Sequence, residues 1–188
     1  MFGMYHPSTE GALRQGEIVT GIRQAMLVVD TLESELLEIE FRSHPFAIVL
    51  SQDCNLDQDL RAHQSRDPSA ANRLIHSVLF AKMSVATEVR RRVPPNIWDR
   101  IKKNKDERYH FLEAVAQTDD ALGEGLPELG IDFKRYMTIP TEEIYKQIGA
   151  NAGRRCRLIS PFREHLSTRF CYYQARVALP EEHYSIRE

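Results

Sequence analysis

Alternating hydrophobic and polar positions predict β-strands in the first half of the chain. Between residues 37 and 42, Leu, Ile and Phe alternate with charged residues, which is typical of a strand with one buried and one exposed face. Five apolar residues at 46–50 run into a polar segment, so they predict a buried strand whose exposed end begins at Ser51. Apolar and β-branched residues predict two further strands, at 15–22 and 74–83.

The second half of the chain mixes strands with helices. Strand-like segments occur at 108–115 and 131–139, and helical segments occur near 85–104 and at 141–148. The clearest helix is 160–177, because its apolar residues recur every three or four positions after a Ser-Pro start. We expect this helix to pack against a sheet through its apolar face.

These elements predict a single α+β domain at 15–188. Successive strands joined by short connections usually pair, which favours a small antiparallel sheet or barrel with helical insertions and a C-terminal amphipathic helix. Residues 1–14 show no apolar period and are expected to form a flexible N-terminal arm. The polar segment 59–72 is expected to be a mobile surface loop.

Composition narrows the class of protein. The chain has 188 residues, of which 42% are hydrophobic and 28% charged, as in globular domains, which argues against collagen, coiled coil and wholesale disorder. Acids at positions 30, 33 and 35 interrupt the apolar stretch near 26–37, so we expect a cytoplasmic protein with no membrane partner. The three cysteines form no CxxC pair and no glycine-rich phosphate loop is present, so no disulfide framework, metal or cofactor is expected.

Charge is distributed unevenly along the chain. Residues 1–60 carry 10 acids and 3 bases, whereas residues 61–118 carry 6 acids and 12 bases. Seven of those bases lie in or near the predicted helical segment: Arg90, Arg91, Arg92, Arg100, Lys102, Lys103 and Lys105. They favour a polyanionic partner such as a nucleic acid, or an acidic protein, although a solvated helix face has the same composition.

The polar segment after the buried strand is the first candidate site, because binding residues are often found where strands end. Its members are Ser51, Gln52, Asp53, Cys54, Asn55 and Asp57. The thiol of Cys54 is a nucleophile if a histidine lowers its pKa, and otherwise it is a small residue at a strand end. The acids have the spacing of hard-cation ligands, but a solvated turn bonded to its own backbone is the simpler interpretation.

Arg108 and His110 form a second candidate site. They lie two residues apart on a predicted strand, so they are expected to share one face, with Tyr109 and Phe111 on the other. A shared basic face suits anion binding, while cross-strand pairing with an acid is the structural alternative.

One stretch, residues 15–84, resembles a known family. Gly16-Glu17-Ile18-Val19, then an alternating strand, then His44-Pro45 leading into Ile48-Val49-Leu50-Ser51 are similar to the opening of MazF/PemK-like toxins. The resemblance implies a small SH3-like, partly open antiparallel β-barrel and a metal-independent endoribonuclease, in which the 2′-hydroxyl of a single-stranded RNA attacks its own phosphate. It also implies an antitoxin or another protein partner, and it leaves a homodimer open.

The catalytic positions of that family are an arginine before the Leu-Ser strand and a threonine at the end of the later strand. Here His44 stands at the arginine position and Ser84 at the threonine position. The catalytic residues implied by the resemblance are Arg42, His44, Ser51 and Ser84. Histidine can act as acid or base near neutral pH but lacks the guanidinium fork, which Arg42 would supply. Because both positions differ from the family, the alternative is a non-catalytic binding module of a bacterial stress or phage-defence system.

Overall fold

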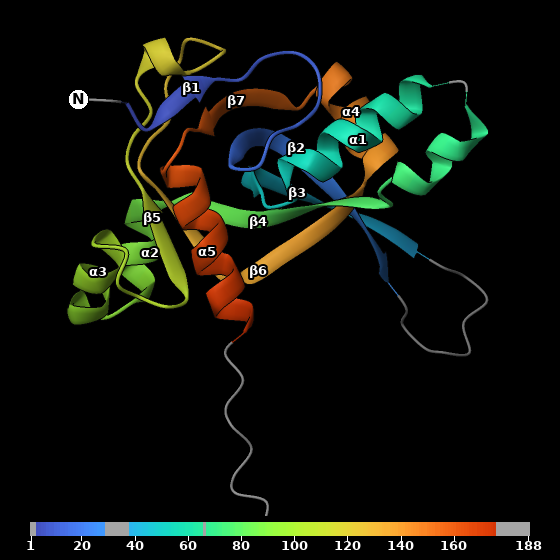
Figure 1. Ribbon diagram of the computed structural model, residues 1–188. Helices are drawn as coiled ribbons and strands as arrows, with labels where there is room; N and C mark the ends of the chain where they lie inside the picture. The colour runs from blue at the N-terminus through green and yellow to red at the C-terminus, as the bar shows by residue number, and fades with distance from the viewer. Residues whose placement is uncertain (1–2, 29–37, 66, 176–188) are drawn as a thin grey trace, which may run out of the picture.

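The computed structural model describes residues 3–28, 38–65 and 67–175. Seven strands form one antiparallel sheet in the order β1-β7-β2-β3-β4-β6-β5 (Figure 1). The strands are β1 (Tyr5–Pro7), β2 (Glu17–Val28), β3 (Glu38–Val49), β4 (Ser77–Val85), β5 (Tyr109–Leu112), β6 (Leu129–Pro140) and β7 (Gly153–Leu158). The helices are α1 (Asp53–Gln64), η1 (Pro68–Arg73), α2 (Ala86–Arg92), α3 (Pro95–Lys102), η2 (Gln117–Asp119), α4 (Thr141–Ala150) and α5 (Phe162–Gln174).

The α+β class predicted from the sequence is confirmed. Within the described ranges the sheet is open, because its outer strands, β1 and β5, do not pair with each other. None of the helices in these ranges is long and apolar enough to cross a membrane.

The centre of the sheet is buried on both faces, which explains why its strands read as continuous apolar runs. The buried apolar residues form two separate hydrophobic clusters. Adjacent residues of β3 enter different clusters, because Ile48 belongs to the first cluster and Val49 to the second. Leu166 of α5 packs in the first cluster, and α5 crosses in front of the sheet in Figure 1. Leu56 of α1 and Ile144 of α4 pack in the second cluster.

The C-terminal helix follows its predicted pattern over the described residues. Leu166 is fully buried, and Phe162, Phe170 and Tyr173 pack against the same cluster. The apolar face expected from three- and four-residue spacing is therefore confirmed. The end of the predicted helix, at 176–177, lies outside the described residues.

Residues 59–72 were expected to form a loop, but most of this segment is helical. Helix α1 continues to Gln64, and η1 begins at Pro68. Leu56, Asp59 and Ala62 are three residues apart and form the buried side of α1. Only three residues of the helix are buried, and one of them is an acid, so the sequence shows little of the apolar period that marks a helix.

The first residues are docked against the domain, in contrast to the expected free arm at 1–14. Strand β1 pairs with β7, with Tyr5 opposite Leu158. Leu13 is fully buried, and its amide donates a hydrogen bond to the hydroxyl of Tyr145 at 3.1 Å. Backbone pairing therefore holds residues 5–7 and apolar burial holds residue 13, while positions 1 and 2 of the predicted arm lie outside the described residues.

The strand at 37–42 was expected to bury its apolar side, and this prediction is wrong for the residues described. Ile39 is 60% exposed and Phe41 is 58% exposed. Strand β3 pairs with β4 only along Phe46–Val49, and β2 pairs with β7 only along Glu17–Thr20. The outer halves of β2 and β3 therefore leave the sheet as a two-stranded ribbon, at the lower right of Figure 1. Position 37 lies outside the described residues.

Two ion pairs lie inside the domain. Arg154 donates to both carboxylate oxygens of Glu17, at 2.6 and 2.9 Å, and the Glu17 side chain is fully buried. Arg155 donates to both oxygens of Asp120, at 2.8 and 2.6 Å, and that carboxylate is also fully buried. Both arginines belong to β7. The two ion pairs therefore hold β7 to β2 and to the loop that follows η2.

Candidate functional site

Two of the predicted catalytic residues lie in one cavity. Arg42 and His44 of β3 line a cavity of about 270 Å³. The other residues that line it are Gln24, Lys82, Arg135, Tyr136 and Met137. Strands β2, β3, β4 and β6 therefore each contribute at least one side chain.

The pairing of β4 with β6 explains how the cavity collects its basic side chains. Ala81 pairs with Tyr136, whereas Met83 pairs with Ile131, so residues 132–135 of β6 stand opposite the single residue Lys82. Such a bulge bends the strand and re-aims its side chains. Lys82 and Arg135 are the residues that this irregularity brings to the cavity.

Two smaller hollows continue from the cavity, with volumes of about 30 and about 170 Å³. Both are lined by Lys82, Ser84, Arg92 and Arg135, and Lys82 and Arg135 also line the first cavity. We call the three hollows together the basic groove. It is defined by Arg42, His44, Lys82, Ser84, Arg92, Arg135 and Tyr136, and two acids, Glu88 and Asp132, also line it. Three of the four predicted catalytic residues thus lie in one groove.

The basic side chains of the groove are only partly neutralised. Neither Arg42 nor Lys82 forms an ion pair with an acid in the described ranges, and Arg92 meets Glu88 at 3.4 Å in an exposed pair. Arg135 lies 3.5 Å from Asp132, but that carboxylate is already bound by Arg108. The lining thus holds four bases, Arg42, Lys82, Arg92 and Arg135, against two acids, Glu88 and Asp132, and this excess of positive charge attracts anions.

His44 is the most enclosed member of the groove. It is 3% exposed, its Nε2 lies 3.4 Å from Oε1 of Gln24, and its Nδ1 is buried without a hydrogen-bond partner. Burial, and then the charges of Lys82 and Arg42, hold the pKa of His44 below its usual value, so its ring is neutral at pH 7. In this arrangement neither ring nitrogen is open to a ligand in the groove.

Ser51 does not lie in the groove. Its hydroxyl accepts a hydrogen bond from the amide of Leu79 at 2.9 Å, which continues the pairing between the ends of β3 and β4. At a strand rise of roughly 3.3 Å per residue, the seven residues from His44 to Ser51 span about 20 Å. The predicted set of four catalytic residues is therefore not assembled in one place.

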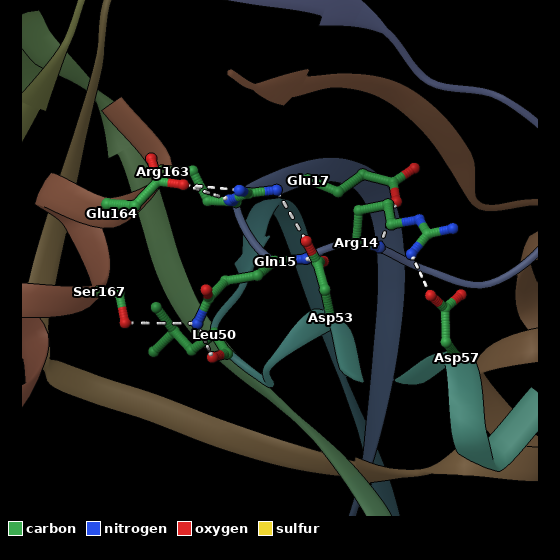
Figure 2. Close-up of polar contacts among 9 residues, drawn as sticks. All are labelled: Arg14, Gln15, Glu17, Leu50, Asp53, Asp57, Arg163, Glu164 and Ser167. Atoms are coloured by element: carbon green, nitrogen blue, oxygen red, sulfur yellow. Dashed lines mark hydrogen bonds and ion pairs between the residues drawn. The ribbon is translucent and has the colours of Figure 1, made fainter. Parts of the chain in front are cut away.

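Residues 52–57 begin helix α1 instead of forming a loop. Figure 2 shows Asp53 accepting hydrogen bonds from the Gln15 amide at 2.6 Å and from Arg163 Nη1 at 2.8 Å. One turn later, Asp57 accepts from Arg14 Nη1 at 2.7 Å. These contacts join the entry to β2, the start of α1 and the start of α5. Both carboxylates thus hold other segments of the chain together from the start of a helix, so the expected solvated turn bonded to its own backbone is wrong.

Gln15 completes this junction. Its Nε2 donates to the carbonyl of Leu50 at 3.0 Å and lies 3.5 Å from the hydroxyl of Ser167. Gln52 and Asn55 are exposed in the first turn of α1, and Gln52 makes no side-chain cap. The described residues contain no cluster of three or more His, Cys, Asp or Glu that could hold a metal ion.

Cys54 lies exposed on α1, with Gln52 Oε1 at 3.8 Å and Asn55 Oδ1 at 3.7 Å from its sulfur. No histidine is among these contacts, so the arrangement does not provide the base that a cysteine nucleophile needs.

Thiol labelling under native conditions is expected to modify Cys54 and Cys171 quickly, because both are exposed. Cys156 is buried, and burial raises the pKa of its thiol to about 12, so it should react only after unfolding. Titration with a chromogenic disulfide before and after adding denaturant measures both classes. Rapid native labelling of all three thiols would contradict the packing of β7.

Arg108 and His110 do not share a face. Arg108 donates to both oxygens of Asp132 on β6, at 2.7 and 2.6 Å, as in the structural alternative of cross-strand pairing with an acid. His110 points into the core against Phe133 and His165, and burial lowers its pKa to about 3. The predicted shared basic face is therefore wrong.

Sequence reasoning missed three residues of the groove: Lys82, Arg135 and Tyr136. Lys82 is the only charged residue of β4, and this exception in an apolar strand was the available signal. Arg135 and Tyr136 gave no such signal: the bulge brings Arg135 to the groove, and Tyr136 lies there through its pairing with Ala81 across the sheet.

Comparison of this chain with family models, with curated proteins and with solved structures found no match.

Proposed function

We propose that this protein binds single-stranded RNA in the basic groove. The observation that carries the proposal is that Arg42, Lys82 and Arg135 line one cavity together with Tyr136. Arginine and lysine side chains bind the phosphates of a nucleic-acid backbone, and aromatic rings stack on unpaired bases. This combination is typical of proteins that bind single strands.

Tyr136 is suited to base stacking. Its side chain is 51% exposed, and its ring meets Phe170 of α5 edge-on with the centroids 6.0 Å apart. The contact with Phe170 fixes the ring, while the other parts of the ring remain open. Bases within a duplex are already stacked on one another, so this platform favours a single strand.

Binding ranks ahead of cleavage as the function of the groove. Attack by a 2′-hydroxyl needs a base within hydrogen-bond reach of that hydroxyl. The neutral ring of His44, beside Arg42 and Lys82, has the right chemistry for a base, but Nδ1 is buried and Nε2 faces Gln24. Cleavage is therefore the second candidate and requires the His44 side chain to move.

A MazF/PemK-like, SH3-like arrangement of the first strands is part of this proposal. The segments that carry the resemblance form β2, β3 and the end of β4, which are consecutive neighbours in the sheet. Ser84, at the family's threonine position, lies in the groove, and Arg42 supplies the guanidinium that His44 lacks. Both observations support an RNA-binding role for the same surface.

The test is a titration of a short labelled single-stranded RNA by fluorescence anisotropy, with the duplex of the same sequence as comparison. We expect saturable binding of the single strand and weaker binding of the duplex. Tyr136→Ala should weaken single-strand binding by about 1–3 kcal/mol, or roughly 5- to 150-fold, while leaving duplex binding unchanged. Equal affinity for both forms, or no binding of either, would refute the proposed function.

The same mixtures are analysed on denaturing gels to detect cleavage. Products that form with the wild-type protein and are absent with His44→Ala would establish RNA cleavage, the second candidate, as the protein's activity. Intact RNA alongside saturable binding is the result expected for a binding protein.

A further inference from the structure

The outer half of β3 forms a free backbone edge of the ribbon made by β2 and β3. Strand β3 pairs with β2 along its length but meets β4 only from Phe46 onward, so residues 38–44 have no partner on that side within the described ranges. The matching edge of β2 is covered at Arg23, whose amide donates to Gln147 Oε1 at 2.7 Å and whose carbonyl accepts from Gln147 Nε2 at 2.8 Å. Beyond Arg23, residues 24–28 of β2 likewise have no partner strand on their outer side in the described ranges, so the longer open edge is that of β3, at residues 38–44.

One face of the ribbon carries exposed apolar side chains, and the guanidinium of Arg23 lies over the Phe41 ring, 4.6 Å from its centroid. Leu27 pairs with Ile39, and Ala25 pairs with Phe41, so these four side chains lie on the same face. Leu27, Ile39 and Phe41 are each more exposed than buried, at 57, 60 and 58%. An open strand edge beside exposed apolar residues is a template for pairing with another strand.

We propose that a second copy of this chain pairs with the outer half of β3 in antiparallel orientation, with Phe41 at the two-fold axis. In this register each Glu40 lies opposite the Arg42 of the other copy, so the dimer gains two cross-strand ion pairs. The two Phe41 rings face each other on the apolar side, continuing the row made by Ala25 and Phe41. Opposite charges and aromatic pairs in these positions stabilise paired strands.

The charges around Phe41 indicate that the strand that pairs with the outer half of β3 comes from another copy of this chain. The same charges select the register of that pairing. Around Phe41 the sequence reads Glu40-Phe41-Arg42, which is complementary to itself when reversed. A register centred on Glu40 would place two glutamates opposite each other at the axis, and like charges there are destabilising. A symmetric, self-complementary patch is what a two-fold dimer requires.

The interface is expected to be weak and reversible. A pair of short strands with their flanking side chains belongs to the class of interfaces below about 1,200 Å², which is typical of transient complexes. We therefore expect a monomer–dimer equilibrium that changes over the micromolar range of protein concentration.

Sedimentation velocity of the full chain over a range of concentrations tests the dimer by mass. Glu40→Arg alone and Arg42→Glu alone should each weaken dimerisation by at least about tenfold, because each replaces two attractive pairs with two repulsive ones. The double exchange, Glu40→Arg with Arg42→Glu, should restore it. Glu128→Arg, an exposed acid outside the ribbon, is the control for charge and should leave the dissociation constant unchanged.

A monomer at every concentration would overturn the dimer. A double exchange that dimerises no better than the single variants would overturn the register. Phe41→Ser changes the apolar face without touching either charge and should also weaken the dimer. All readouts are masses measured without RNA. Because Arg42 also lines the basic groove, Glu40→Arg, which leaves Arg42 intact, is the variant that distinguishes failure of the dimer from failure of RNA binding.

Discussion

Replacing Asp120 with alanine is expected to lower the free energy of unfolding by about 3–5 kcal/mol. The carboxylate of Asp120 is fully buried and accepts two hydrogen bonds from Arg155, which is itself almost completely buried. It also accepts from the backbone amides of Leu122, Glu124 and Gly125. Alanine leaves a buried guanidinium without its main partner and three amides without an acceptor.

Urea denaturation followed by circular dichroism measures this loss. Glu124→Ala is the matched control, because Glu124 meets the same Arg155 at 3.0 Å but its side chain is 69% exposed. It should cost less than about 1 kcal/mol. Similar losses for the two variants would contradict the assignment of the buried pair as the anchor of β7.

Asp120 should also make the free energy of unfolding depend on pH in the acidic range. The guanidinium of Arg155 holds the pKa of Asp120 at about 2, below its unfolded value of 3.8. A lowered folded-state pKa stabilises the protein above the unfolded pKa, and that stabilisation is lost as the pH falls through the folded pKa. About 2 kcal/mol should therefore disappear between roughly pH 4 and pH 2 in the wild type but not in the Asp120→Ala variant.

The strands and the last helix were predictable because their signal is local. The apolar run at 46–50 and the three- and four-residue spacing in 160–177 each reflect which residues of that one element are buried, so they can be recognised without knowing the rest of the fold. The ribbon was mispredicted because alternation shows that a strand has two different faces, but not whether anything covers the apolar one. Ile39 and Phe41 alternate correctly and are still exposed, because β4 turns away after Val85.

The groove was only partly predictable. Arg42, His44 and Ser84 came from a resemblance to a family, and they do lie along one groove. Lys82 and Arg135 are 53 positions apart and meet through a bulge between paired strands, for which the sequence has no local pattern. Asp53 and Asp57 were expected at a loop because helix α1 has few apolar residues to announce it.

The double variant Lys82→Ala with Arg135→Ala is expected to weaken binding of single-stranded RNA by about 10- to 100-fold at low salt. Both side chains line all three hollows of the groove, so their removal eliminates two phosphate contacts from its centre. Arg135 is exposed and Lys82 is partly exposed, so the fold should be retained. Anisotropy titrations of wild type and variant measure the difference.

Lys103→Ala with Lys105→Ala is the matched control. It removes the same charge from exposed positions after α3, outside the groove. We expect an effect several-fold smaller than that of the groove variant, because neither lysine lines the groove and both act on a bound strand only at long range. If the control lost as much affinity as the groove variant, the cluster of bases near α3 would be the RNA-binding surface instead.

The salt dependence of RNA affinity reports how many phosphates the groove neutralises. With contacts from Arg42, Lys82, Arg92 and Arg135, the logarithm of the association constant should fall with the logarithm of salt concentration with a slope of about −3. In the Lys82→Ala/Arg135→Ala variant the slope should be shallower by about 1.4. An unchanged slope in that variant, or wild-type binding that does not respond to salt, would contradict the assignment of the basic groove as the RNA-binding site.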